Sequence, residues 1–180
     1  MVKVCIGLGS NLGNRGNNIL QAWDRLGMVE GVKMLGLSSP YYSEPVGMQS
    51  TNRFVNAVGM LRTSIPPEEL LGEMLAVEGG LGRKRRHKNR PEDRTIDLDL
   101  LYWGNRVSDG PYLILPHPEI ANRLFVLLPL VEIAPEFVHP VLRKTSMEML
   151  QKRMAELKDS DPGAEVTKTT WSVVDSEVSK

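Results

Sequence analysis

The pattern of hydrophobic and polar residues predicts a β-strand in four stretches of the chain: residues 2–7, 32–42, 54–61 and part of 93–104. Hydrophobic and polar positions alternate in the first and the last of these stretches, whereas residues 54–61 are largely apolar. Two other stretches show helical spacing. Apolar residues recur at helical intervals from Ile19 to Leu26, before Gly27, and residues 64–80 carry helix start and stop signals, with prolines and glutamates first and two glycines last. The predicted order is therefore β-α-β-β-α-β.

This order predicts an α+β fold of the ferredoxin-like βαββαβ type, an antiparallel sheet with helices packed on one face. Three segments follow as C-terminal additions: the proline-rich stretch LILPHPEI, a short helix at 119–128 and an amphipathic helix around 146–157. We expect residues 1–158 to form a single domain. Residues 159–180 are polar and predict a flexible tail, with a short strand at 169–174.

The segment DRTIDLDLLYWG, residues 93–104, has two chemically different faces. Successive side chains of a strand point to opposite sides, so one face consists of the apolar residues Ile96, Leu98, Leu100 and Tyr102. The other face carries Asp97 and Asp99, with Cα atoms roughly 6.5–7 Å apart in strand geometry. Such a pair repels by about 2 kcal/mol at an effective dielectric of about 20, and hardly at all in open water. The pair is either solvated surface or a site for Mg²⁺, which prefers oxygen ligands.

A basic loop comes directly before this strand. The sequence RKRRHKNRPEDR, residues 83–94, contains seven Lys or Arg and two acidic residues. Such a loop is often just solvated surface, but this one leads into the strand that carries Asp97. Guanidinium groups bind phosphate oxygens, and carboxylates bind the cation of a magnesium–phosphate complex. The segment therefore favours a magnesium–phosphate site.

Composition is that of an ordinary globular protein. The chain has 180 residues, of which 41% are hydrophobic and 24% charged. No apolar run is long enough to span a membrane, and the first apolar stretch is too short for a signal peptide. A net charge of zero argues against a general nucleic-acid or membrane binder. A single cysteine, Cys5, excludes an internal disulfide, and we expect a cytoplasmic protein.

Several motifs are ambiguous. GLGSNLG, residues 7–13, has Leu12 where a dinucleotide fingerprint needs glycine or alanine, so it predicts a tight turn between strand and helix. Asn56 in the apolar strand FVNAVGM either bridges backbone groups or binds the edge of a heterocycle. Glu78 is ambiguous in the same way. Phe54 and Phe125 are either core residues or residues that stack on a ligand.

Taken together, these motifs resemble the 6-hydroxymethyl-7,8-dihydropterin pyrophosphokinases of folate biosynthesis. The matching pieces, in order, are GLGSNLGNR, YYSEPVG, RFVNAV, LLGEMLAVEGGLGR, RTIDLDLLYWGN and LILPHPEIANRLFVLLPLVEIAP. They span about residues 2–140. The resemblance implies the same ferredoxin-like α+β fold. It also implies transfer of pyrophosphate from ATP to the pterin hydroxymethyl oxygen, with AMP and the pterin diphosphate as products.

The resemblance further implies roles for individual residues. Asp97 and Asp99 would hold two Mg²⁺ ions that bridge the ATP phosphates, and Arg83 and Arg94 would be the catalytic residues that stabilise the transferring group. The implied pterin-binding positions are Ser43, Pro45, Val46, Gly47, Phe54, Asn56, Asp97 and Phe125. The implied ATP-binding positions are Glu78, Arg83, Arg85, Arg86, Arg94, Leu100, Ile114, His117 and Arg123.

The basic loop departs from the family pattern. Members commonly read RWGPRTIDLD, whereas this chain reads KNRPEDRTIDLD, without the tryptophan and with one additional residue between Arg83 and Arg94. The expected partners are ATP and a reduced pterin, with no nucleic acid, membrane or obligate protein partner. The alternative is a small ferredoxin-like RNA-binding module that uses loop 83–94. Against it, the predicted strands lack the interleaved aromatic residues that base stacking needs.

Overall fold

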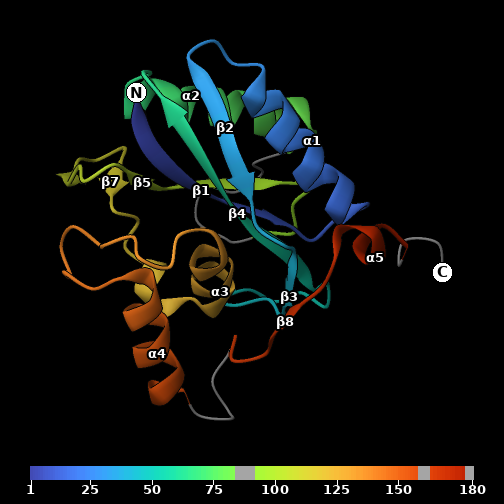
Figure 1. Ribbon diagram of the computed structural model, residues 1–180. Helices are drawn as coiled ribbons and strands as arrows, with labels where there is room; N and C mark the ends of the chain where they lie inside the picture. The colour runs from blue at the N-terminus through green and yellow to red at the C-terminus, as the bar shows by residue number, and fades with distance from the viewer. Residues whose placement is uncertain (84–91, 158–162, 177–180) are drawn as a thin grey trace.

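The computed structural model describes residues 1–83, 92–157 and 163–176. The elements, shown in Figure 1, are β1 (Val2–Ser10), α1 (Arg15–Gly27), β2 (Val32–Leu37), β3 (Tyr41–Ser43), β4 (Phe54–Thr63), α2 (Pro67–Gly80), β5 (Asp97–Trp103), β6 (Ser108–Asp109), β7 (Ile114–Leu115), the 3-10 helix η1 (Ile120–Asn122), α3 (Leu124–Ile133), α4 (Ser146–Glu156), β8 (Val166–Lys168) and α5 (Trp171–Ser176). Of the helices in these ranges, none combines the length and the apolar character needed to cross a membrane.

The large sheet of the described chain is antiparallel, in the order β5-β1-β4-β3-β8, and β2 also pairs with β4. Residues 32–42, predicted as one strand, form the two strands β2 and β3. At the interruption, the Ser38 hydroxyl accepts a hydrogen bond from the Val58 N–H at 3.0 Å, where a backbone carbonyl would continue a regular strand. Pro40 follows and has no N–H to donate to a neighbouring strand. Both pieces still line up along β4, so the predicted element order is present.

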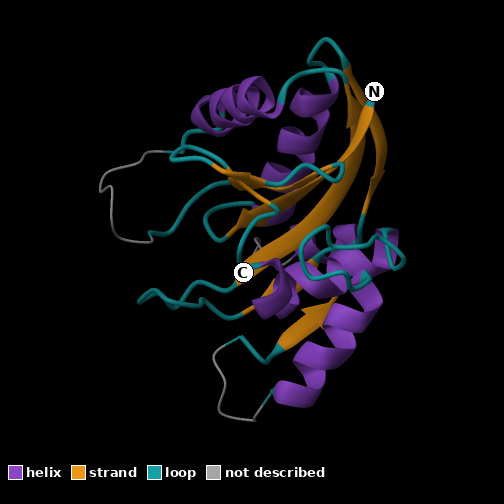
Figure 2. Cartoon of the chain, turned by 90° about the vertical axis from the view of Figure 1, so that its left-hand side faces the viewer, coloured by secondary structure: helices purple, strands orange, loops and turns teal. Residues whose placement is uncertain are grey.

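Helices cover both faces of the sheet (Figures 1 and 2). α1 and α2, the two helices of the predicted βαββαβ order, bury the same face, which carries Ile6 and Leu8 of β1, as the sequence pattern predicts. The C-terminal additions α3 and α4 pack on the opposite face, in a second core that contains Cys5 and Val58. α3, with the sequence LFVLLPLVEI, is apolar almost all round, as expected of a helix buried between other elements.

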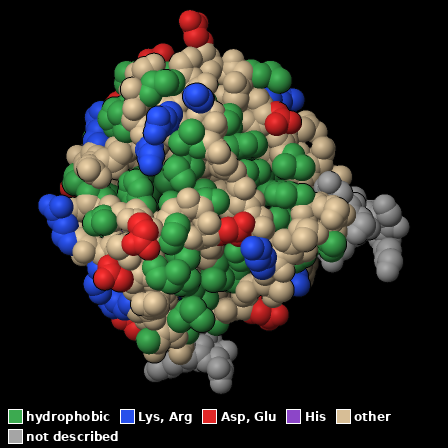
Figure 3. Space-filling view, viewed as in Figure 1, with side chains coloured by type: hydrophobic (Ala, Val, Ile, Leu, Met, Phe, Trp, Pro, Cys, Tyr) green, Lys and Arg blue, Asp and Glu red, His purple; other side chains and the backbone are tan. Residues whose placement is uncertain are grey.

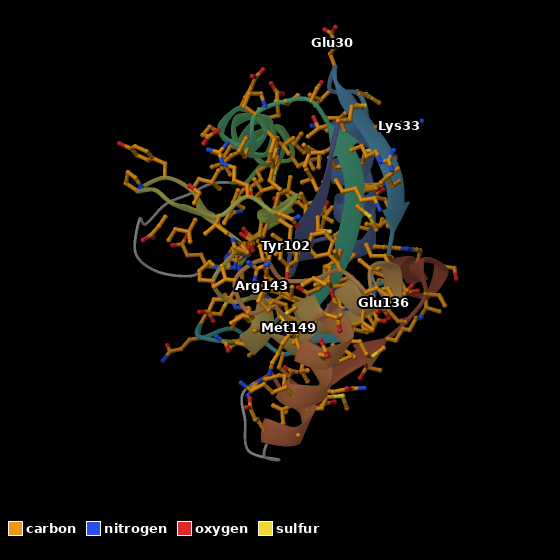
Figure 4. The ribbon with its side chains drawn as sticks, turned by 60° about the vertical axis from the view of Figure 1, so that its left-hand side comes forward. Glu30, Lys33, Tyr102, Glu136, Arg143 and Met149 are labelled. Carbon is orange, nitrogen blue, oxygen red and sulfur yellow. The ribbon has the colours of Figure 1, made fainter. Side chains whose placement is uncertain are left out.

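β5 does not keep strict alternation to its end. Its register with β1 shifts between Cys5 and Ile6, so that Leu100 lies opposite Ile6 but Tyr102 lies opposite Cys5. A bulge of this kind inserts one residue and turns the following side chains to the other face. Tyr102, predicted to share the face of Leu100, therefore lies in the second core together with Met149 of α4 (Figure 4).

The described part of the C-terminal segment, residues 163–176, packs onto the rest of the fold and is not a free tail. β8 pairs antiparallel with β3, where Val166 lies opposite Ser43. α5 contacts α1, and its Val174 is fully buried in the first core. The strand predicted at 169–174 is therefore wrong, since α5 begins at Trp171 and the paired strand β8 ends at Lys168.

Candidate functional site

A hollow of about 300 Å³ lies on the sheet face that α3 only partly covers. Its walls come from β1, β3, β4, β5, the loop 44–53 and α3. Among the residues predicted to bind the pterin, those that line it are Ser43, Val46, Phe54, Asn56, Asp97 and Phe125. It is also lined by Arg94, Asp99, His117 and Arg123. The fold thus gathers residues from distant parts of the sequence into one concave site.

Two glycines of β1 form part of the floor of this hollow. A Cβ atom on Gly9 would lie 3.2 Å from Oδ1 of Asn56 and 4.0 Å from Cβ of Asp97, and one on Gly7 would lie 3.8 Å from Cβ of Asp99. The turn predicted between strand and helix is present but begins only at Asn11, because β1 continues to Ser10 and α1 begins at Arg15. A signal was present in the sequence, since the two glycines alternate with apolar residues at strand spacing and so share one face.

Asn56 presents a buried amide to the hollow. It is 6% exposed, and its Nδ2 donates a hydrogen bond to the Ser43 hydroxyl at 2.9 Å. Asn56 belongs to β4 and Ser43 to the adjacent β3, so two strands fix this pair. A primary amide has two N–H donors and a carbonyl acceptor. The remaining groups match the edge of a heterocycle, which agrees with one of the two interpretations of Asn56.

Asp97 is ion-paired with two arginines. One carboxylate oxygen contacts Nη1 of Arg83, and the other lies 3.1 Å from Nη2 of Arg94. Arg83 also contacts Glu78, which is 1% exposed and accepts a hydrogen bond from the Leu98 N–H at 2.8 Å. Glu78, predicted to bind ATP, is therefore buried where it anchors both Arg83 and the start of β5, and it does not line the hollow.

Asp99 is the second carboxylate of the hollow, and its pKa is raised to about 6. Burial is the main cause and the negative charge of Asp97 adds to it, while the nearby arginines oppose the rise. A cation next to Asp99 would offset both causes. Within the described ranges, no group of three or more His, Cys, Asp or Glu side chains is placed to hold a metal ion. The two carboxylates fit Mg²⁺, which commonly takes one or two carboxylates and completes its shell with substrate phosphates and water.

A second hollow of about 300 Å³ adjoins the first, and Asp99 and His117 line both. It is also lined by Leu100 and Ile114, two of the residues predicted to bind ATP. Burial and the positive charge of Arg123 lower the pKa of His117, which favours the neutral imidazole. The two predicted substrate regions therefore meet at Asp99.

Two arginines stack on the two aromatic rings of the first hollow. The guanidinium carbon of Arg94 lies 5.2 Å from the ring centroid of Phe54, and that of Arg123 lies 5.7 Å from the ring centroid of Phe125. Cation–π contacts of this kind orient a guanidinium group without using its N–H donors. Phe54 is 7% exposed, so it is both well buried and part of the hollow.

A few predicted positions lie elsewhere. Pro45 and Gly47 belong to the loop 44–53 but are not among the residues that line the hollow. Arg85 and Arg86 lie outside the described residues. Glu44 and Met48 line the hollow and were not predicted, because an irregular loop has no periodicity that shows which side chains face inward.

The family model of 7,8-dihydro-6-hydroxymethylpterin-pyrophosphokinase matches residues 5–135 of the chain. The chain belongs to this pyrophosphokinase family. The resemblance inferred from the sequence motifs is thereby confirmed, and the matched range includes every site residue that those motifs implied.

Individual proteins give the same result. The chain is 39% identical over 147 residues to the 2-amino-4-hydroxy-6-hydroxymethyldihydropteridine pyrophosphokinase of Synechocystis sp., covering 82% of this chain and 74% of that protein. The enzyme of the same name from Aquifex aeolicus is 38% identical over 82% of this chain and 90% of its own length. A folic acid synthesis protein of Pneumocystis carinii is 42% identical, but the chain spans only 18% of it.

Among solved structures, an HPPK-DHPS protein crystallised with substrates superposes with a TM-score of 0.71 at 13% identity, over 88% of this chain and 44% of that one. At this identity the likeness concerns the fold, which is thus an α+β fold with an antiparallel sheet and packed helices.

Proposed function

We propose that the protein transfers pyrophosphate from ATP to the hydroxymethyl group of 6-hydroxymethyl-7,8-dihydropterin, giving AMP and the pterin diphosphate, a step of folate biosynthesis. One observation carries this proposal. A single hollow places two aromatic rings and a buried amide next to a cluster of two carboxylates and two arginines. The first group suits a planar heterocycle, and the second suits phosphates that are bound together with a divalent cation. Membership of the pyrophosphokinase family supports the same reaction.

The pterin would occupy the first hollow. The rings of Phe54 and Phe125 supply apolar surface for its flat faces, and stacked aromatic pairs are favourable beyond the area they bury. The Asn56 amide would pair with the pterin edge, held by its hydrogen bond from Nδ2 to the hydroxyl of Ser43. Backbone groups of the loop that contains Pro45, Val46 and Gly47 would make the remaining hydrogen bonds with the edge of the pterin. The hydroxymethyl arm would then point toward Asp97.

ATP would bind across the second hollow, with Leu100, Ile114 and His117 around the nucleoside and the phosphates near Asp99. Asp97 and Asp99 would hold the Mg²⁺ ions, two per site. When bound, Mg²⁺ neutralises phosphate charge and orients the triphosphate. The phosphate oxygens would also meet Arg83, Arg94 and Arg123, together with Arg85 and Arg86 of the basic loop.

The chain's own contribution to the chemistry is alignment and charge stabilisation. Phosphoryl transfer needs little covalent help from the protein, and the hydroxyl that attacks is a weak nucleophile. Arg83 and Arg94 both contact Asp97, so their guanidinium groups lie where phosphate oxygens bound beside that carboxylate would need donors. The ion pair with the buried Glu78 helps to fix the position of Arg83. We assign Arg83 and Arg94 as the catalytic residues on this basis.

We also propose that the sheet has ferredoxin-like topology, because β5-β1-β4 followed by the β2/β3 pair is the strand order of a split βαβ fold. Residues 1–158 would form one catalytic domain, on which the C-terminal segment packs. The protein would act in the cytoplasm and need no obligate protein partner.

The alternative, an RNA-binding module, has less support. On the face that Figure 3 shows, Lys and Arg side chains are interspersed with Asp and Glu, and no broad basic surface is present among the described side chains of that face. A thermal-shift panel separates the two functions. We expect the melting temperature to rise with a non-hydrolysable ATP analogue, Mg²⁺ and the pterin together, and to stay unchanged with single-stranded RNA. The opposite pattern would refute the proposed enzymatic function.

A further inference from the structure

Asp93 joins three segments of the chain just outside the first hollow. One of its carboxylate oxygens accepts a hydrogen bond from Nδ2 of Asn11 at 2.6 Å, and the other accepts from Nδ2 of Asn52 at 2.6 Å. Asn11 directly follows β1, Asn52 lies in the loop 44–53 that precedes β4, and Asp93 lies four residues before the start of β5. A charged acceptor makes both hydrogen bonds stronger than their neutral equivalents.

Asn11, which is hydrogen-bonded to Asp93, is also hydrogen-bonded to the backbone of Arg94. It is 3% exposed, and its backbone N–H donates to the Arg94 carbonyl at 3.1 Å while its Oδ1 accepts from the Arg94 N–H at 2.7 Å. The backbone of Arg94 is thus held to the end of β1 by two hydrogen bonds. With that backbone fixed, the Arg94 side chain reaches both Asp97 and the ring of Phe54.

Asn52 connects Asp93 to the loop 44–53, which forms another wall of the first hollow. Its loop contributes Val46 and Met48 to the hollow and runs directly into Phe54 at the start of β4. The backbone N–H of Asn52 also donates to the Ser50 hydroxyl at 3.0 Å. Burial alone would raise the pKa of Asp93, but hydrogen bonds from Ser50, Asn11 and Asn52 and the charge of Arg94 outweigh it and hold that pKa below its usual value. The carboxylate is therefore ionised at neutral pH, as both hydrogen bonds need.

We propose that Asp93 is a positioning residue of the active site, which fixes the substrate loop 44–53 through Asn52 and the catalytic Arg94 through Asn11. It does not line the first hollow and takes no part in the chemistry. Its two contacts have different consequences, because one holds a wall that touches the pterin and the other holds the arginine that faces the phosphates. This inference rests on the function proposed above.

Four variants test it: Asp93→Ala, Asn52→Ala, their double variant, and Asp24→Ala, which removes an exposed carboxylate on α1 as a matched control. We expect Asn52→Ala to raise KM for the pterin about tenfold, as for the loss of one charge-assisted hydrogen bond, and to leave kcat nearly unchanged. Asp93→Ala should raise that KM by about the same factor and also lower kcat. The double variant should have the KM of Asp93→Ala, and Asp24→Ala should match the wild type.

A second readout does not depend on activity. In the free protein, amide hydrogen exchange in residues 44–53 should become faster in Asp93→Ala and Asn52→Ala and stay unchanged in Asp24→Ala. If Asp93→Ala only lowers the melting temperature and the active fraction, with wild-type KM, kcat and exchange, the inference is wrong. If the wild type releases no AMP, the proposed function fails, and faster exchange would then still identify the connection through Asp93.

Discussion

Gly9, one of the two glycines at the floor of the first hollow, gives the sharpest test of the proposed pterin site. In Gly9→Ala the new methyl group would lie 3.2 Å from Oδ1 of Asn56 and 3.8 Å from Cδ1 of Phe54. The Asn56 side chain would have to shift by a few tenths of an ångström, which would disturb its hydrogen bond with Ser43. Overpacking of this kind costs about 1–3 kcal/mol, and a weakened hydrogen bond about 0.5–1.5 kcal/mol.

Part of this cost is offset in the folding equilibrium. Replacing glycine by alanine restricts the unfolded chain and stabilises the folded state by about 0.4–1 kcal/mol. The net cost is then about 0.5–4 kcal/mol, so we expect Gly9→Ala to fold, with a melting temperature lowered by about 1–16 °C. Pterin affinity has no such compensation, since the methyl group and the displaced amide both lie at the surface proposed to bind the pterin. It should fall about 10- to 100-fold, which corresponds to about 1.4–2.8 kcal/mol.

The assay is an equilibrium titration with 6-hydroxymethyl-7,8-dihydropterin, with and without a non-hydrolysable ATP analogue and Mg²⁺. Gly36→Ala is the matched control, because its Cβ would have no atom within 4 Å and it lies on β2, away from the hollow. The control should bind like the wild type. The reasoning is refuted if Gly9→Ala binds the pterin as tightly as the control, or if affinity for the ATP analogue alone falls by the same factor.

Three further outcomes are expected. Asp97→Ala should lower kcat by about 10²–10³-fold or more and shift the melting temperature by less than about 4 °C, since it removes attraction to the arginines and repulsion from Asp99 together; a large destabilisation would instead indicate a structural role. Asp99→Asn should make the metal-free protein more stable than the wild type above pH 6, because the raised pKa of Asp99 in the folded state means that its ionised form disfavours folding there. Urea unfolding should show that this difference in stability vanishes as the pH falls toward the pKa of the unfolded state, about 3.9. Glu132 accepts hydrogen bonds from Ser39 and from the Tyr41 hydroxyl, and these outweigh the upward effect of burial and lower its pKa. Glu132→Gln should therefore lower the free energy of unfolding by about 1–3 kcal/mol at pH 7, and by progressively less as acid protonates the wild-type group. An equal loss of stability at all pH values would contradict this.

Much of this site could be predicted from local sequence patterns. Strand periodicity placed Asp97 and Asp99 on one face, and the structure has both carboxylates in the same hollow. Arg94 is separated from the apolar Ile96 by two positions, so regular alternation would turn it to the core side, but β5 begins only at Asp97 and the Arg94 side chain contacts Asp97. Alternation also failed after Leu100, because the bulge opposite β1 depends on pairing between distant segments and leaves no mark in the sequence of one strand.

Other features depend on tertiary packing and could not be read locally. Gly7 and Gly9 suggested a turn, because glycine favours turns, yet here the missing side chains leave space between β4 and β5. The ion pair of the buried Glu78 with Arg83 could not be read from the sequence pattern, and the nucleotide-binding role of Glu78 stays a prediction. The connection from Asp93 to Asn11 joins residues 82 positions apart, and no periodicity could indicate it.

The most direct test of the proposed reaction is to identify the nucleotide product when the protein is given ATP, Mg²⁺ and 6-hydroxymethyl-7,8-dihydropterin. Chromatography with phosphorus NMR should find AMP and the pterin diphosphate in equal amounts, and neither when the pterin is omitted. Release of ADP with a pterin monophosphate, or ATP hydrolysis that does not depend on the pterin, would contradict pyrophosphate transfer at this site.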